Sequence, residues 1–195
     1  MRILIATRND HKLHEIRAIL ADSGMEISDL RSVEGAPEEL PETGSTFVDN
    51  AIEKARFIYE LTGQVAVADD SGIEVDALGG APGVFSKRFS PEGTDQANNA
   101  FLLQKLAGVS DRRARYRCVI AVVGPKGEFV AEGRCEGSIV EGPRGHGGFG
   151  YDPYFVPEEF PDRTMAELTL DEKNAISHRG RAFRQLPSLL TRIHS

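Results

Sequence analysis

The sequence predicts a mixed α/β fold. It opens with a short apolar strand, Ile3 to Ala6, then a polar loop, then a helix whose apolar residues recur at helical spacing until Gly24. Residues 115–123 and 128–140 are typical of long strands, and the turn Gly124–Gly127 between them indicates an antiparallel hairpin. No linker or internal repeat is visible, so we expect a single domain over residues 1–195.

Composition and charge exclude several classes of protein. The 195 residues are 40% hydrophobic and 27% charged, as in ordinary soluble globular proteins. No apolar run approaches the ~18 residues that span a bilayer, and the N-terminal run is too short for a signal peptide, so we expect a cytoplasmic protein with no membrane association. A formal net charge of −7 argues against a nucleic-acid partner but leaves small polyanions open. Cys118 and Cys135 lack metal-site spacing and are expected to be reduced and partly buried.

The segment Ala68–Gly72 (ADDSG) follows an apolar run and is expected to end a buried strand. Two adjacent ionised carboxylates repel each other and are costly to bury, so Asp69 and Asp70 are expected to face water, a cation or a reacting group. The alternative is a turn in which Asp70 or Ser71 bonds to the backbone before Gly72.

The polar loop from Thr7 to Lys12 stands between a strand end and a helix start. Backbone N–H groups at a helix start favour phosphate, and Lys12 adds a positive charge. The segment lacks the glycine spacing of a P-loop. The alternative is therefore a plain helix cap by Asn9 or Asp10 with a solvated lysine.

Further helix signals follow. Thr46 with Asp49 predicts a helix start just after Glu42, and the helix is expected to end before Gly63. Asn50 and Lys54 share one face of it and are interpreted as a surface pair. The apolar stripe of this helix comprises Phe47, Ala51, Ala55 and Ile58. Residues 73–78 then alternate like a half-buried strand, 79–83 form a loop, and Thr94 caps a helix to about Leu106.

Four glycines flank two aromatic residues in the segment 145–153. Glycine adds no packing, so we expect a mobile loop that presents Phe149 or Tyr151 as a stacking platform for a base. The alternative is an ordinary turn with a core phenylalanine.

The C-terminal part predicts a helix capped by Ser177 that runs through Ile193. His178 and Arg179 would lie in its first turn, where cations oppose the helix dipole, so they favour an anionic or acceptor-rich partner. The alternative partner is a carboxylate of the protein itself.

Together these segments resemble the inosine/xanthosine triphosphate pyrophosphatase family. The resemblance is carried by Thr7–Lys12, Glu42–Gly44, Phe47, Asn50–Ala55, Ala68–Gly72, Gly79–Gly83, Gly147–Pro153, Lys173 and Ile176–Gly180. It implies a two-lobed mixed α/β fold around a long curved central sheet, with the active site in the inter-lobe cleft, and a homodimer. It also implies Mg²⁺-dependent hydrolysis of non-canonical purine nucleoside triphosphates (ITP, dITP, XTP) to the monophosphate and pyrophosphate, which cleanses the nucleotide pool.

The resemblance also implies roles for individual residues. Glu42 and Asp70 would hold the metal, Asp70 would activate the attacking water, Phe149 would stack on the purine and Asp152 would line the base pocket. The residues implied to bind substrate are Thr7, Arg8, Asn9, Asp10, His11, Lys12, Lys54, Ser71, Phe149, Gly150, Tyr151, Asp152, Lys173, His178 and Arg179. Arg8 departs from the family, which commonly has glycine there. Arginine does not adopt a positive φ cheaply, so we expect a local difference in this loop.

Donor and acceptor counting bears on the choice of base. Donors from Arg179 and His178 would pair with a 6-oxo purine and oppose the 6-amino group of adenine. Such a site can discriminate by about 10⁴-fold without editing. Two other functions stay open. A non-catalytic nucleotide-binding module would gain little from Glu42 and Asp70 beside phosphate. A pyrophosphatase for dTTP, UTP or modified pyrimidines is harder to exclude.

Overall fold

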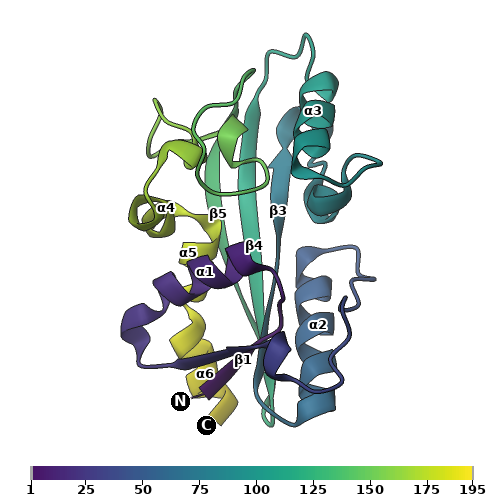
Figure 1. Cartoon of the computed structure of the whole chain (residues 1–195), viewed down its shortest axis with the longest axis vertical. Coiled ribbons are helices and arrows are strands. Elements are labelled where there is room, and N and C mark those ends of the chain that lie inside the picture. The colour runs from purple at the N-terminus through teal and green to yellow at the C-terminus, as the bar shows by residue number, and fades with distance from the viewer. Residues whose placement is uncertain (1, 195) are drawn as a thin grey trace. The chain divides into compact units, whose positions relative to one another are not determined.

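The computed structural model describes residues 2–194 (Figure 1). The chain divides into two compact units. The first contains the residues up to Asp70, Cys118–Gly133, and the residues from Arg179 on. The second contains Ser71–Arg117 and Arg134–His178. No helix within residues 2–194 is long and apolar enough to cross a membrane.

The strands form a six-stranded mixed sheet in the order β2-β1-β3-β4-β5-β6. They are β1 (Arg2–Ile5), β2 (Glu26–Asp29), β3 (Ala66–Val75), β4 (Arg113–Gly124), β5 (Gly127–Ile139) and β6 (Phe155–Pro157). β1 pairs in parallel with β2 and β3, whereas β6 pairs antiparallel with β5. β4 and β5 are neighbours joined by two residues, so the predicted hairpin is confirmed, as is the mixed α/β class.

Within residues 2–194, six α-helices accompany the sheet. They are α1 (Asp10–Ile19), α2 (Phe47–Thr62), α3 (Asp95–Lys105), α4 (Leu170–Ile176), α5 (His178–Phe183) and α6 (Leu186–His194). Short 3₁₀ helices occupy Ala21–Ser23, Leu30–Ser32, Asp76–Leu78, Gly83–Arg88, Asp152–Tyr154 and Met165–Glu167. β1, α1, α2, α3, β4 and β5 match elements expected from the sequence, whereas β3 and the C-terminal helix differ from expectation and β2, β6 and α4 were not predicted.

In the first unit, helices cover both faces of the strands. α1 and α6 lie on one face and α2 on the other (Figure 1). Ile3 and Ile5 join the core cluster that contains α1 and α6 residues, while Leu4, which points the opposite way, is also buried. This double burial explains why β1 is apolar at successive positions rather than at alternate ones.

Helix α2 begins and ends where the sequence predicts. The Thr46 side chain accepts a hydrogen bond from the Asp49 N–H, and Gly63 ends the helix with φ of 66°. The predicted apolar stripe is buried. The surface-pair interpretation of Asn50 and Lys54 was wrong, because these side chains are only 0% and 5% exposed. They lie on the face of α2 that packs against the sheet.

The strand expected to end at the aspartate pair does not end there. β3 continues without a break from Ala66 to Val75 and passes through Asp69, Asp70, Ser71 and Gly72. Both the predicted strand end and the alternative Asx turn are therefore wrong. The turn-forming tendency of this segment gives way to the pairing of β3 with its neighbours in the sheet.

The second unit has its own core around α3, β4 and β5. Thr94 caps α3 by accepting from the Ala97 N–H, as predicted. On β4, Ala114 and Tyr116 point into this core. The alternate residues Arg115 and Arg117 form ion pairs with acidic side chains of the neighbouring segments.

The C-terminal segment forms three helices rather than one capped run. Ser177 is the C-cap of α4 and directly precedes α5. α5 ends at Phe183, and α6 begins at Leu186 with Pro187 in its first turn. Proline cannot donate a helical hydrogen bond, so one continuous helix through this position is disfavoured.

Both cysteines are free and buried, as expected, and burial raises the pKa of Cys118 to about 12.

Candidate active site

Asp69 and Asp70 point to opposite faces of β3. Successive side chains of a strand alternate, so the two carboxylates are separated although their residues are adjacent. Asp69 faces the side of α1, where it meets Lys12, and Asp70 faces α2, where it meets Asn50 and Lys54. Because the two carboxylates lie on opposite faces of the strand, the repulsion expected between them is reduced. Asp69 pairs with Lys12 and Asp70 with Lys54.

Asp69 is held in the ionised form. Its Oδ2 lies 2.8 Å from Lys12 Nζ and 3.5 Å from Arg179 Nη2. Burial would raise its pKa, but the charges of Lys12 and Arg179 outweigh burial and hold the pKa of Asp69 well below its usual range. This carboxylate is 2% exposed, so it acts as a fixed negative charge inside the first unit.

Asp70 has the opposite electrostatic character. Asn50 Nδ2 donates to Asp70 Oδ2 at 3.0 Å, and Lys54 Nζ lies 3.4 Å from Oδ1. Burial dominates over the Lys54 charge and raises the pKa of Asp70 above its ordinary value. A raised pKa makes a carboxylate a better proton acceptor, and neighbouring groups with divergent pKa values are typical of catalytic sites.

Glu42 and Asp70 converge on the same cation. Lys54 Nζ is 2.6 Å from Glu42 Oε1 as well as 3.4 Å from Asp70 Oδ1. Burial would lower the pKa of Lys54, but the charges of Asp70 and Glu42 raise it. Two hard carboxylates that share one cationic position fit the ligand preference of Mg²⁺, which usually takes one or two carboxylates and completes its shell with water and phosphate. No three His, Cys, Asp or Glu side chains of residues 2–194 form a cage of their own.

The loop before α1 is organised mainly by its own side chains. Asn9 caps α1 by accepting from the Lys12 N–H at 3.1 Å, and Thr7 Oγ1 accepts from the Asn9 N–H. The helix-cap alternative is therefore confirmed for Asn9, but Lys12 pairs with Asp69 instead of being solvated. His11 lies exposed in the first turn of α1.

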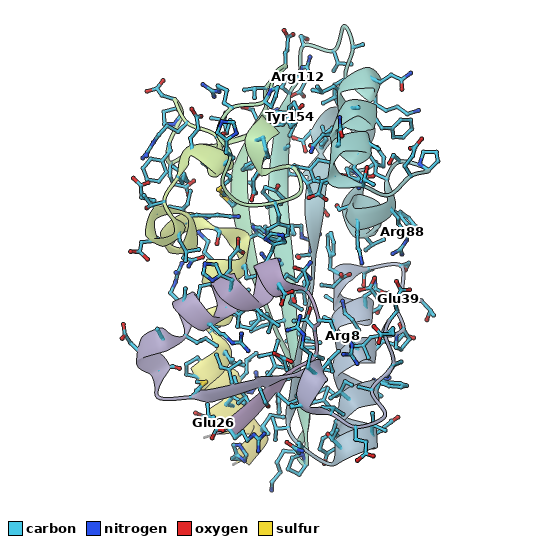
Figure 2. The ribbon with its side chains drawn as sticks, in the orientation of Figure 1. Arg8, Glu26, Glu39, Arg88, Arg112 and Tyr154 are labelled. Carbon is cyan, nitrogen blue, oxygen red and sulfur yellow. The ribbon has the colours of Figure 1, made fainter. Side chains whose placement is uncertain are left out.

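Two charged residues of this loop turn away from the aspartates. Asp10 pairs with Arg31 at 2.6 Å. Arg8 Nη2 donates to the Ala36 carbonyl at 3.0 Å, and Figure 2 shows Arg8 beside the loop that contains Glu39. Every residue with positive φ among those described is a glycine, so Arg8 fits the loop without backbone strain.

In the second unit, Asp152 gathers three donors. Its Oδ2 accepts from Lys173 Nζ at 2.5 Å and from the Phe149 N–H at 2.9 Å. Its Oδ1 accepts from the Tyr116 hydroxyl at 3.2 Å. Lys173 Nζ also lies 5.1 Å from the centroid of the half-buried Phe149 ring. The structure thus brings Phe149, Asp152 and Lys173 together.

Tyr151 is not a stacking platform. It is 5% exposed, belongs to the core of the second unit and donates its hydroxyl to the Ser86 carbonyl at 2.7 Å. Of the two aromatic residues proposed for that role, Phe149 is the one with exposed surface. Tyr151 is drawn into the core because Tyr carries both a large apolar ring and a hydroxyl that finds a backbone partner.

His178 and Arg179 are consecutive but have different partners. The His178 ring stacks on Tyr116 with centroids 4.6 Å apart and planes 8° from parallel. Arg179 is 1% exposed and donates to Glu15 Oε2 at 2.6 Å. A carboxylate of the protein is thus the partner of Arg179 in the structure, which is the alternative left open by the sequence. Its contact with a base stays a prediction.

Sequence reasoning missed two buried polar residues of these clusters, Glu15 and Tyr116, and misplaced a third, Asn50. Glu15 directly precedes Ile16 on the buried face of α1, where a charged residue signals a partner. Tyr116 alternates with Arg115 and Arg117 on β4, which places it on the inner face. Asn50 was noticed but assigned to the surface. Ser71, in contrast, lies half-buried in β3 as part of the predicted motif.

Carboxylates and lysines gathered on one strand and the helices beside it supply the groups that a divalent cation and a phosphate would need. The chain belongs to the Ham1 family, whose model matches residues 3–189. It is 48% identical over 198 residues to the dITP/XTP pyrophosphatase of Desulforamulus reducens, covering 100% of this chain and 98% of that protein. It is 50% identical over 191 residues to the dITP/XTP pyrophosphatase of Streptomyces coelicolor, covering 95% and 94%.

Solved structures show the same fold. A HAM1 protein from Coxiella burnetii is 42% identical with a TM-score of 0.87, and the Staphylococcus aureus Ham1 protein is 38% identical with a TM-score of 0.86. Each comparison covers 98% of both chains. A nucleoside-triphosphatase, or dITP/XTP pyrophosphatase, from Mycobacterium abscessus is 49% identical with a TM-score of 0.76, covering 97% and 99%.

Proposed function

We propose that the protein hydrolyses non-canonical purine nucleoside triphosphates, such as ITP, dITP and XTP, to the monophosphate and pyrophosphate. The observation that carries this proposal is the cluster of Glu42, Lys54 and Asp70, in which two carboxylates share one cation and one of them has a raised pKa. Full-length similarity to proteins named dITP/XTP pyrophosphatase supports the substrate class.

The reaction is an in-line displacement at the α-phosphorus. A water oxygen forms a bond to this phosphorus while the bond to the oxygen that bridges the α- and β-phosphates breaks, and pyrophosphate leaves. Asp70 Oδ accepts the proton of the attacking water, a role suited to a buried carboxylate with a raised pKa. Lys12 and Lys54 supply positive charge for the phosphates. The resemblance adds Ser71 and the loop Thr7–His11, in which Arg8 and Asp10 are paired elsewhere in this structure.

Glu42 and Asp70 are the residues that would hold Mg²⁺. When bound, the ion supplies Lewis acidity toward phosphate oxygens and lowers the pKa of a coordinated water. Asn50 keeps the Asp70 carboxylate oriented by its hydrogen bond to Oδ2. Lys54 balances the two carboxylates before substrate binds and can turn its ammonium to a phosphate oxygen afterwards.

Recognition of the base is assigned to Phe149 and the residues bonded near it, and the family resemblance adds Arg179. Phe149, which is half-buried, stacks on the purine, and Asp152 and Lys173 lie beside it. The resemblance adds Gly150 and His178 to the residues that contact the substrate. Arg179 supplies donors for a 6-oxo group, which adenine does not offer. A cytoplasmic location is part of this proposal and is supported by the proposed substrates, which belong to the cellular nucleotide pool.

A substrate panel tests the proposal. Wild-type protein with Mg²⁺ is given ITP, dITP, XTP, ATP, GTP, dTTP and UTP, and pyrophosphate and orthophosphate are measured separately. We expect pyrophosphate from ITP, dITP and XTP at a kcat/KM well above that for ATP. Binding without any product would indicate a nucleotide-binding module, and preference for dTTP or UTP would indicate a pyrimidine pyrophosphatase.

We also propose a homodimer, supported by the family resemblance alone. Sedimentation at micromolar concentration should give twice the chain mass of 21.3 kDa. A species that sediments with the mass of one chain would contradict this part of the proposal without affecting the reaction.

A further inference from the structure

We propose that Asp95 and Asn99, on α3, are positioning residues that set the orientation of Phe149 for stacking on the base. The proposal rests on the proposed function, which assigns the stacking role to Phe149. Neither Asp95 nor Asn99 belongs to the motifs that carry the family resemblance.

Both backbone groups of Gly150 are bound by α3. The Gly150 N–H donates to Asp95 Oδ2 at 2.7 Å, and the Gly150 carbonyl accepts from Asn99 Nδ2 at 2.9 Å. Residues four apart on a helix share one face, so a single face of α3 grips one residue of the glycine-rich loop at two points. The hydrogen bond that the Asp95 carboxylate accepts is the stronger of the two, because its acceptor is charged.

The hydrogen bonds to Gly150 also restrain the backbone of Phe149, the residue before it. The Gly150 N–H, in the peptide group after Phe149, donates to Asp95 Oδ2. The Phe149 N–H, in the peptide group before it, donates to Asp152 Oδ2 at 2.9 Å. Both peptide planes that flank the Phe149 Cα are thereby held. The direction of the ring is then limited to its side-chain rotamers.

The loop needs such external bonds because it is rich in glycine. Gly148 and Gly150 have φ of 69° and 62°, a left-handed conformation that glycine adopts without strain but also leaves readily. Without the α3 bonds, ordering of the loop would have to occur when the nucleotide binds, and that cost would appear as weaker binding.

Helix α3 is itself anchored in the core of the second unit, so Asp95 and Asn99 are held in place. Leu102 and Leu106 at its C-terminal end are fully buried in the core of the second unit. Asn98, next to Asn99, is equally buried but serves another loop: it accepts from the Ser90 N–H at 2.8 Å and donates to the Lys87 carbonyl at 3.0 Å. Asn98 therefore offers a matched control on the same helix.

The experiment compares Asn99→Ala and Asp95→Ala with the control Asn98→Ala in the full chain. For the first two we expect KM for ITP to rise about five- to tenfold, the effect of losing one loop-ordering hydrogen bond. The inhibition constant of inorganic pyrophosphate, which lacks a base, should stay within twofold. Asn98→Ala should lower Tm about as much as Asn99→Ala does, but it should leave KM unchanged. In a Phe149→Ala background, Asn99→Ala should add nothing to KM.

Two results would overturn the inference. One is an unchanged KM in Asn99→Ala and Asp95→Ala, and the other is an equal loss of pyrophosphate and ITP binding. Amide hydrogen exchange at Phe149 and Gly150 provides a readout independent of activity, with faster exchange expected in Asn99→Ala but not in Asn98→Ala. If wild-type protein does not hydrolyse ITP, the proposed function fails, and unchanged exchange would separately reject the positioning role.

Discussion

Asn50 donates a hydrogen bond from Nδ2 to Asp70 Oδ2 at 3.0 Å, while its Oδ1 accepts from the Gly44 N–H at 2.9 Å. One buried amide therefore ties the loop that follows Glu42 to the strand that carries Asp70. The two carboxylates assigned to the metal depend on the same side chain for their placement. This relationship makes Asn50 the first position to test.

Replacement of Asn50 by Ala should lower kcat by about tenfold and destabilise the fold by about 1–3 kcal/mol, because a buried donor and acceptor lose their partners. Steady-state kinetics and denaturant unfolding measure the two effects. Asn98→Ala, equally buried on another helix, should destabilise without the loss in kcat. An Asn50→Ala enzyme with wild-type kcat would remove Asn50 from the positioning of Asp70.

Replacement of Asp70 by Asn should reduce kcat by about 10³-fold or more, because the amide keeps the size of the side chain but cannot accept the proton or hold the cation. Isothermal titration with a substrate analogue should show that much of the affinity remains. Turnover within a few-fold of wild type would exclude Asp70 as the base.

The neighbouring substitution Asp69→Asn should act mainly on stability. It would leave Lys12 and Arg179 without their shared carboxylate, and the loss of one partner of a buried ion pair costs about 3–5 kcal/mol. Thermal and chemical unfolding measure this directly. An Asp69→Asn protein as stable as wild type would show that the buried cations have other adequate partners.

Removal of divalent cations should stop the reaction. EDTA is expected to abolish pyrophosphate release, and added Mg²⁺ should restore it. Glu42→Gln should raise the Mg²⁺ concentration needed for half-maximal activity, since the site loses one of two anionic ligands. Undiminished hydrolysis in EDTA would contradict the assignment of Glu42 and Asp70.

Replacement of Arg179 by Ala should lower kcat/KM for ITP far more than for ATP, because only ITP offers an acceptor at the 6-position. The measured quantity is the ratio of the two values before and after substitution. An equal fall for both substrates would mean that Arg179 acts through Glu15 and Asp69 on the fold and not on the base. Thermal unfolding in parallel separates lost stability from lost selectivity.

The pH dependence of stability can be tested at Glu172. Hydrogen bonds from Arg163 and from the Thr169 N–H lower the pKa of Glu172 to about 2. A carboxylate with a depressed pKa in the folded state stabilises the protein above its ordinary pKa near 4.5, and that contribution is lost as pH falls toward 2. The Tm difference between wild type and Glu172→Gln should therefore shrink between pH 5 and pH 2. A constant difference would contradict the shift.

Local signals predicted most of the fold. The caps at Asn9, Thr46 and Thr94 and the hairpin between β4 and β5 depend on residues within a few positions of one another, which a sequence pattern can display. The unbroken β3 could not be predicted in this way. The segment from Asp69 to Gly72 has turn chemistry, and the partners that stabilise it in a strand are distant in sequence.

The candidate site shows the same limit. The motifs selected Glu42, Lys54, Asp70 and Asp152, and the structure places each among charged partners. What the sequence did not reveal was which cation meets which carboxylate. Lys12 and Asp69 are 57 positions apart, and Glu15 and Arg179 are 164 apart. No helical or strand period connects such residues.

Because side chains alternate between the two faces of β3, the face that each aspartate occupies depends on whether the number of residues before it is odd or even. A single residue inserted before Asp69 would turn every later side chain of the strand to the other face, so that Asp69 leaves Lys12 and takes the place that Asp70 holds beside Lys54. Two inserted residues would return each later side chain to its original face, but they would shift the strand by two positions relative to its neighbours. The number of residues between Ala66 and Asp70 therefore matters to the site as much as the aspartates themselves.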